Sequence, residues 1–367
     1  MSTRILEIID KVTPLEYFPA VPQNFVLRDG ESVPPEVVLG NPDISLYCLD
    51  EENRQALFVE TSPGVDLMQA PFFYLAQYQH AQRLIAVPYD TLHRLADDCP
   101  GAAGNLVLIY SVGRCGSTLI SQALNAVDGV LSYSEPDVYT QIAMLRHLDA
   151  SRDEEYVRLI RSCTRMLRRD APTVAIKFRA SGIHLADLLH QVFPDARSLF
   201  LCRNAERWLE SMNAGFTPNM PGPEAEALFM QFVLAQAPLL MPFITRHDRS
   251  ATLAEAYMLT WLSVVDKYLT LRGDGVPFLP VRYEDIKARP KSSLLELLTY
   301  CGLPVEGFDD AYDAFSSDSQ EGTVLSQASR LQNPAPALLP EDYAQARAVL
   351  AEHATVRTAD FDVRAAG

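Results

Sequence analysis

The stretch Asn105–Thr118, NLVLIYSVGRCGST, combines the residue types that bind a phosphate-like anion. Gly113 and Gly116 predict a tight turn, because glycine adopts backbone conformations that other residues avoid. The apolar run before the turn predicts a buried strand, and the helical spacing after it predicts a helix that starts near Ser117. The first amides of a helix are unsatisfied and carry partial positive charge, so an anionic oxygen is the expected ligand. Arg114 and the loop hydroxyls complete this predicted site.

The turn differs from the phosphate loop of nucleotide hydrolases. That motif, G-x-x-x-x-G-K-[ST], requires glycine in place of Ser111 and a lysine after its last glycine, whereas Ser117 follows Gly116 here. No later predicted strand ends in the lone aspartate that usually helps such enzymes to hold Mg²⁺. The sequence therefore predicts a site for a phosphate-like group without a metal, and a turn that binds no ligand is the structural alternative.

Polar residues lie at the ends of four further predicted strands. They are Glu135 after Val130–Tyr133, Lys177 within Thr173–Phe178, Arg203 after Ser198–Cys202, and Tyr283 after Phe278–Arg282. Ligands of open α/β sheets collect at the carboxyl ends of the strands, so we expect these side chains to lie near the loop. Lys177 is one of only five lysines, and an ammonium in an apolar strand needs an anion, either a ligand or a structural ion-pair partner.

Arg203 and Ser211 are spaced so that both can reach one phosphate. Ser211 lies eight residues after Arg203, on a helix predicted over Glu206–Ala214 that can run back past the strand end. A guanidinium fork and a hydroxyl can converge on one anion in this arrangement. An ordinary strand-to-helix corner with a surface arginine is the alternative.

Three segments resemble, in the same order, motifs of the sulfotransferases that use 3′-phosphoadenosine 5′-phosphosulfate (PAPS). They are GRCGST, FLCRNAERWLESM and VRYEDIKARPKSSLLELLTYCGLP, and the resemblance covers roughly residues 105 to 305. It implies that the loop binds the 5′-phosphosulfate through Arg114, Cys115, Gly116, Ser117 and Thr118. It also implies that Arg203 and Ser211 bind the 3′-phosphate and that Tyr283 contacts adenine, although a core tyrosine is the alternative for Tyr283.

The resemblance also suggests the general base. Cytosolic steroid and phenol sulfotransferases carry Lys-Thr-His at the end of the third strand, but this chain reads Lys177-Phe178-Arg179 and has no histidine there. Other branches use a glutamate beyond the phosphate loop, which implies this role for Glu135. We expect its pKa to be raised beside an anion, as suits a carboxylate that takes a hydroxyl proton. The alternative is that Glu135 caps a helix starting near Asp137.

Alternating strand and helix patterns from residue 105 onward predict an α/β fold. We expect a P-loop-like, three-layer αβα domain over residues 101–305, with a central parallel sheet and a helical insertion near 217–250. Residues 1–100 predict a small N-terminal cap on the substrate side, with strands at Ile44–Leu49 and Ala56–Val59 and helical character from Phe72. Residues 306–367 predict a closing segment, which we assign to Gly322–Arg330, and one helix near Glu341–His353.

Composition limits the partners and the location. A net charge of −16 argues against nucleic acid or an anionic membrane, so an anionic donor must be held by local arginines. Six scattered cysteines without C-x-x-C pairs indicate reduced thiols in a cytoplasm. We expect neither a signal peptide nor a membrane span.

The sequence thus predicts a cytoplasmic enzyme that transfers a sulfuryl group from PAPS and releases 3′,5′-ADP. The acceptor is a hydroxyl or amine of a small or carrier-bound molecule, Glu135 is the base, and Lys177 and Arg114 stabilise charge on the departing phosphate. A P-loop kinase and a non-catalytic module that binds 3′,5′-ADP are the alternatives. The sequence identifies neither the acceptor nor the oligomeric state.

Overall fold

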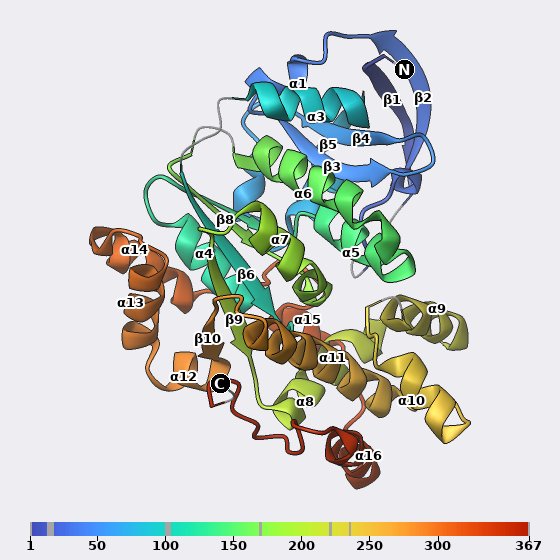
Figure 1. Ribbon diagram of the computed structural model, residues 1–367, viewed down its shortest axis with the longest axis vertical. Helices are drawn as coiled ribbons and strands as arrows, with labels where there is room; N and C mark the ends of the chain where they lie inside the picture. Colours follow the sequence, from blue (N-terminus) through green and yellow to red (C-terminus); the bar gives the residue numbers. More distant parts are fainter. Residues whose placement is uncertain are drawn as a thin grey trace.

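Two sheets organise the chain. The structure is a computed structural model that describes residues 2–12, 18–99, 104–168, 171–219, 222–234 and 236–365. The ten strands in these residues form a parallel and an antiparallel sheet of five strands each, and helices flank the parallel sheet (Figure 1). The predicted α/β class with a central parallel sheet is confirmed.

The parallel sheet has the strand order β10-β9-β6-β8-β7. Its strands are β6 (Asn105–Ser111), β7 (Val130–Ser134), β8 (Thr173–Lys177), β9 (Arg197–Cys202) and β10 (Leu279–Arg282). The apolar residues of β6, β8 and β9 are buried on both faces, as expected of strands covered by helices on either side. All five strands match the predicted runs to within one residue at each end.

The register of the parallel strands brings their carboxyl ends to one edge. Lys177 of β8 pairs with Ile109 of β6 and with Ser134 of β7. On the other side of β6, Ser111 pairs with Leu201 of β9. Residues that follow these strands must therefore meet at this edge, which is where the predicted site residues lie.

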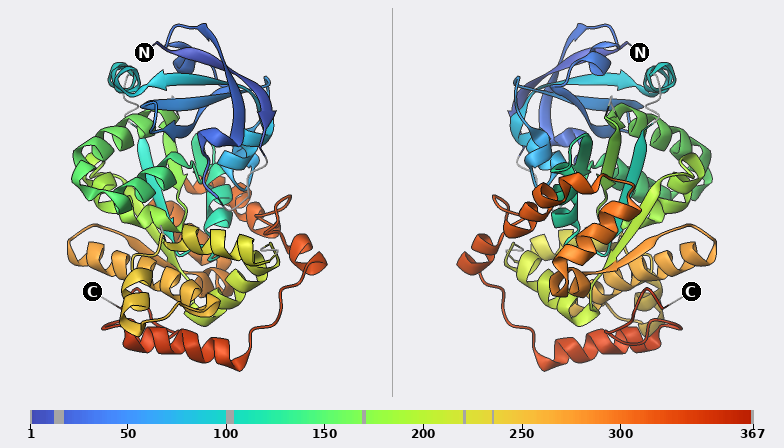
Figure 2. Two further views of the ribbon diagram at one scale, coloured as in Figure 1. Left: turned by 90° about the vertical axis from the view of Figure 1, so that its right-hand side faces the viewer. Right: turned by 90° about the vertical axis from the view of Figure 1, so that its left-hand side faces the viewer.

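Helices cover both faces of the parallel sheet. On one face α4 (Ser117–Asn125) packs on β7, β8 and β6, with α13 and α14 beyond it; α7 and α11 lie on the other face (Figure 2). The helices of this part are α5 (Val138–Leu148), α6 (Asp153–Arg168), α7 (Ala186–Val192), α8 (Ala205–Phe216), α11 (Leu253–Gly273), α12 (Tyr283–Ala288) and α13 (Pro290–Tyr300).

The described parts of the insertion and the tail contain helices but no strand. The insertion between α8 and α11 contains α9 (Pro223–Leu234) and α10 (Leu240–His247); residues 220, 221 and 235 lie outside the description. The tail contains α14 (Phe308–Asp313), α15 (Gln327–Gln332) and α16 (Pro340–Glu352), which confirms the helix predicted near its end. Helix α16 packs along α11, at the end of the molecule remote from the antiparallel sheet (Figure 2).

The N-terminal region is a twisted antiparallel sheet of strand order β2-β1-β5-β4-β3. Its elements are β1 (Arg4–Lys11), β2 (Phe25–Ser32), α1 (Val37–Gly40), β3 (Ile44–Asp50), β4 (Gln55–Thr61), α2 (Phe73–His80), β5 (Ala81–Pro88) and α3 (Tyr89–Asp98). The two predicted strands and the helix after Phe72 are confirmed, whereas β1, β2 and β5 were not predicted. Helix α3 packs on α6. The boundary predicted between residues 100 and 101 lies outside the described residues.

No helix among the described residues is both long enough and apolar enough to cross a membrane.

Candidate active site

The loop between β6 and α4 has the backbone shape of an anion-binding turn. Gly113, Arg114 and Gly116 have positive φ angles of 73°, 51° and 83°. A positive φ is easy for glycine but strained for arginine, and such strain concentrates at functional sites. Gly116 is the N-cap of α4 and Ser117 is its first residue, so the unpaired amides of the first turn face the space above the loop.

The loop is held in place from two sides. The indole N–H of Trp208 in α8 donates to the carbonyls of Val112 and Gly113 at 3.0 and 2.9 Å. The thiol of Cys115 donates to the carbonyl of Leu201 at 3.5 Å and is fully buried. The side chain of Cys115 therefore points into the core, and only its backbone is available to a ligand.

Strands β9 and β10 bring Arg203 and Tyr283 to the loop, as predicted. A Cβ atom added to Gly116 would lie 3.2 Å from the Tyr283 ring. The guanidinium of Arg203 lies 4.7 Å from the centre of the same ring, and its Nη1 donates to the carbonyl of Arg114 at 3.1 Å. A side chain at position 116 would crowd the ring by a few tenths of an ångström, so glycine is favoured there chiefly by the positive φ and further by this contact.

Arg114 points away from its strained backbone toward two polar groups. Its Nε donates to the hydroxyl of Ser211 on α8 at 3.3 Å, and its Nη1 donates to the side-chain oxygen of Gln320 in the tail. Arg203 and Ser211 thus both contact Arg114, which brings them together beside the loop. Gln320 was missed, because it is far away in sequence and belongs to no recognisable motif.

Three arginines gather beside the loop. Burial and the positive charges of Arg330 and Arg203 lower the pKa of Arg114 to about 10, although Asp318 offsets part of the effect. The Nε of Arg203 is buried and has no hydrogen-bond partner among the described residues. Positive charge that Asp318 offsets only in part and an unused buried donor are both features of an anion-binding site. Arg330 is the last residue of the predicted closing segment.

The ends of β7 and β8 carry a buried ion pair. Glu135 follows β7, has a positive φ of 61°, and donates its backbone N–H to the carbonyl of Lys177 at 2.7 Å. Its carboxylate pairs directly with the ammonium of Lys177. The two side chains are only 12% and 4% exposed, so each charge depends on the other for solvation.

The pKa of Glu135 is lowered, so the expectation of a raised value is wrong for this structure. Burial alone would raise the pKa, but the positive charges of Lys177 and Arg179 outweigh burial. The side chain also does not cap α5, since its oxygens face Lys177 and Arg179 and the N-cap residue of α5 is Asp137.

Arg179 connects Glu135 to a second buried carboxylate. Its Nε lies 3.6 Å from Glu135 Oε2 and donates to Asp137 at 2.7 Å. Asp137 is fully buried and also accepts the backbone N–H of Ala20 at 2.8 Å. Arg179 further donates to the carbonyl of Phe18 at 3.2 Å. The N-terminal region therefore contacts the ionic groups of the site. These particular contacts were not predicted, because the partners are remote along the chain.

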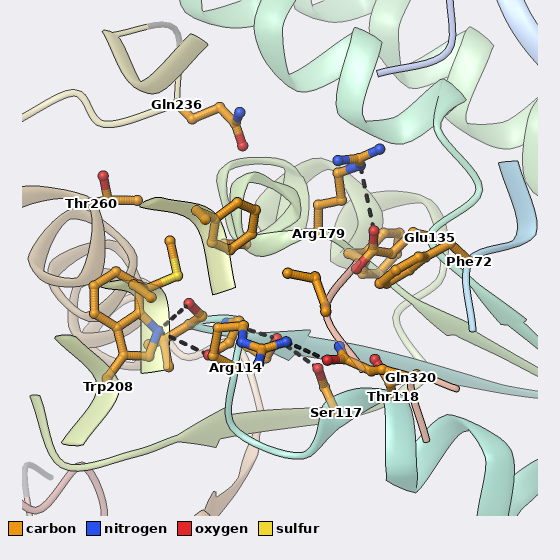
Figure 3. Close-up of a pocket in the computed structure, with 18 of the residues that line it drawn as sticks. Phe72, Arg114, Ser117, Thr118, Glu135, Arg179, Trp208, Gln236, Thr260 and Gln320 are labelled. Carbon is orange, nitrogen blue, oxygen red and sulfur yellow. Dashed lines mark hydrogen bonds and ion pairs between the residues drawn. The ribbon is translucent and has the colours of Figure 1, made fainter. Parts of the chain in front are cut away.

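One cavity of about 140 Å³ contains both the loop and the ion pair. Figure 3 shows Arg114, Ser117 and Thr118 on one wall and Glu135 and Arg179 on another. Aromatic side chains from several regions also line it: Phe72, Tyr74, Phe178, Trp208, Phe216, Phe229, Phe232 and Tyr257. Phe72 and Tyr74 of the N-terminal region thus line the cavity. Within the described residues, no cluster of three His, Cys, Asp or Glu side chains is suited to a metal ion.

Comparison with known proteins gives a consistent result. The family model described as "Sulfotransferase domain" matches residues 105–334. The fold is similar to that of the sulfotransferase domain from the curacin biosynthetic pathway (14% identity, 68% of this chain and 98% of that chain covered, TM-score 0.42). It is also similar to mouse sulfotransferase SULT7A1 complexed with PAP (13% identity, 71% and 88% covered, TM-score 0.41) and to a sulfotransferase from Alicyclobacillus acidocaldarius (14%, 68% and 95%, TM-score 0.37). No curated protein matches the sequence.

The buried ion pair predicts a specific pattern of stability. Lys177→Met removes the main partner of Glu135 and should lower the free energy of unfolding at pH 7 by about 3 kcal/mol. The loss should be smaller at pH 5, because the pKa of Glu135 rises in the variant and the protonated carboxyl no longer needs a cation. Urea unfolding of the Lys177→Met/Glu135→Gln double variant should recover most of the loss. Lys287→Met, on the exposed side of α12, is the control and should change stability by less than about 0.5 kcal/mol. A Lys177→Met protein as stable as the wild type would contradict the ion pair.

Proposed function

Because the chain belongs to the sulfotransferase domain family, we propose that it transfers a sulfuryl group from PAPS to a hydroxyl or amine of a small or carrier-bound acceptor. The observation that carries this proposal is the single cavity lined by both the anion-binding loop and the Glu135–Lys177 pair. An anionic donor bound at the loop would place its reactive group next to a carboxylate that can accept a proton. The aromatic lining supplies space for an apolar acceptor.

The residues present fit PAPS at both of its anionic ends. We assign the 5′-phosphosulfate to the loop amides from Arg114 to Thr118, with the hydroxyls of Ser117 and Thr118. We assign the 3′-phosphate to Arg203 and Ser211, which is supported by the unpartnered Nε of Arg203 and by the nearby charge of Arg330. Tyr283 lies beside both assignments and is the proposed contact of adenine.

Glu135 is the proposed general base. It takes the proton of the acceptor hydroxyl while that oxygen attacks sulfur, the bond from sulfur to the bridging phosphate oxygen breaks, and its electron pair remains on the phosphate. Lys177 and Arg114 stabilise the negative charge that develops there. The lowered pKa keeps Glu135 ionised at neutral pH, and any interaction that draws Lys177 toward an anion would make the carboxylate more basic.

The most direct test is transfer itself. The protein is incubated with ³⁵S-labelled PAPS and an extract of the source cell, and labelled products are identified by mass. A labelled product that requires the protein supports the proposal. ATP turnover that depends on Mg²⁺ would favour a kinase, and 3′,5′-ADP binding without any transfer would favour a non-catalytic module.

Ligand binding should raise thermal stability without a metal. At a concentration of 100 times its Kd, 3′,5′-ADP should stabilise the fold by about 2.7 kcal/mol, and EDTA should not abolish this effect. Differential scanning fluorimetry with 3′,5′-ADP and, separately, with ATP and Mg²⁺ measures the difference. Stabilisation by ATP with Mg²⁺ but not by 3′,5′-ADP would contradict the assigned donor.

The assigned 3′-phosphate position predicts a ligand-dependent effect. Arg203→Ala should weaken 3′,5′-ADP binding by about 2 kcal/mol, because it removes a charge-assisted contact from a partly desolvated anion. Adenosine 5′-phosphosulfate lacks the 3′-phosphate and should lose much less affinity in titration calorimetry. Arg207→Ala, an exposed arginine on α8, is the matched control and should leave both affinities unchanged. An equal loss for both ligands would show that Arg203 acts elsewhere.

The proposed base predicts a kinetic defect and a pH profile. Glu135→Gln should reduce turnover by roughly 10²–10⁴, while 3′,5′-ADP affinity changes little, because glutamine keeps the shape but cannot accept the proton. In the wild type the acid limb of kcat/KM should lie below the usual range of a glutamate, since the positive charges of Lys177 and Arg179 lower the pKa of Glu135 in the free enzyme. Near-normal turnover in a folded Glu135→Gln protein would exclude this base.

A further inference from the structure

Gln236 is an unpaired amide on the wall of the cavity. It lies just after α9, where its backbone N–H donates to the carbonyl of Val233 at 3.0 Å. The residue is only 8% exposed, and its side chain makes no hydrogen bond to the part of the chain that the structure describes. Figure 3 shows this side chain on the wall opposite Ser117 and Thr118, with its amide directed toward the cavity. The amide is open to the cavity, where water can solvate it, so a molecule that fills the cavity must replace that water with a hydrogen bond of its own or leave the amide unpaired.

The surroundings of Gln236 are apolar and fixed. Phe229, Phe232 and Val233 of α9 line the same wall. The ring of Phe232 lies 5.2 Å from that of Phe18 in the N-terminal region, and Phe229 lies 5.7 Å from Tyr257 of α11, so the wall is supported from both sides. Gln236 is thus a polar group at a defined place on an otherwise hydrophobic surface.

The charged groups that line the cavity are already engaged by other groups. The charged lining residues are Arg114, Glu135, Lys177 and Arg179, which all serve the loop or the buried ion pairs. Thr260, a polar neighbour of Gln236, already donates its hydroxyl proton to the carbonyl of Ala256 at 2.9 Å. A charged ligand group would be left without a counter-ion beside Gln236, whereas a neutral group can both accept from and donate to the amide.

We propose that Gln236 is a specificity-determining residue that binds a neutral polar group of the acceptor. Given the proposed function, the acceptor is an extended, largely apolar or aromatic alcohol or phenol. One hydroxyl faces Glu135, and a second, uncharged hydroxyl, carbonyl or amide at its other end is bound by Gln236. A molecule that lacks the second group leaves the amide buried and unpaired, and the site discriminates against it for that reason.

The test uses two matched pairs of phenols of different length. They are para-phenylphenol and para-benzylphenol, each compared with its para′-hydroxy analogue. Affinities are measured by titration calorimetry in the presence of 3′,5′-ADP, so that binding is read without transfer. In at least one pair the wild type should bind the dihydroxy compound about 10-fold or more tightly, the value of one buried hydrogen bond.

Two variants identify the residue responsible. Gln236→Leu should abolish the preference while it keeps or improves binding of the monohydroxy compounds, because it replaces an unpaired amide with an apolar group. Thr260→Val, on the same wall, should retain the preference. The inference is overturned if the wild type prefers neither member of either pair, if none of the phenols binds, or if the preference survives in Gln236→Leu. A preference that depends on Gln236 without sulfuryl transfer from PAPS would sink the proposed function and leave the binding role of Gln236 standing.

Discussion

The buried carboxylate of Glu135 sets requirements that reach far into the structure. A carboxylate removed from water needs a cation, which Lys177 provides because the register of β7 and β8 places their ends side by side. Arg179 adds a second cation, which in turn requires the carboxylate of Asp137. Asp137 is completely buried and is satisfied partly by the backbone of Ala20. Each of these buried charges is thus stable only because its partner of opposite charge or its hydrogen-bond donor is present. Together these contacts join the parallel sheet to the N-terminal region.

The arginines beside the loop form the second charged group of the site, and their charges are not paired as those of Glu135 and Lys177 are. Arg114, Arg203 and Arg330 repel one another, in a chain whose total charge is −16. The net negative charge of the protein repels anions at long range. Affinity for an anionic ligand must therefore arise from direct contacts, which salt screens least. Backbone amides of the loop, oriented by the left-handed residues Gly113 and Gly116, add to that local attraction. Such a site can select an anion by its shape without attracting polyanions to the rest of the surface.

Local patterns predicted the parallel sheet well, because apolar runs such as that of β6 are read directly from the sequence. They failed for β2, whose polar residues Arg28 to Ser32 resemble a loop but pair with β1. Local patterns also failed to predict side-chain contacts that depend on the register of the strands or on segments remote in the sequence. The pKa of Glu135 depends on which strand ends beside it, and Gln320 meets Arg114 from more than two hundred residues away. The Arg203, Ser211 and Tyr283 positions were predictable because each follows a recognisable strand.

The N-terminal region is needed to complete the site. Arg179 donates to the carbonyl of Phe18, and the backbone N–H of Ala20 donates to Asp137. The family match begins at residue 105, after the N-terminal sheet has ended. A chain cut at that boundary would keep every motif of the family, yet it would lose the amide that satisfies Asp137 and the aromatic wall formed by Phe72 and Tyr74. The region that matches the family is therefore too short to bury and satisfy the carboxylates of Glu135 and Asp137 by itself. A domain transferred into another protein would need the first hundred residues as well.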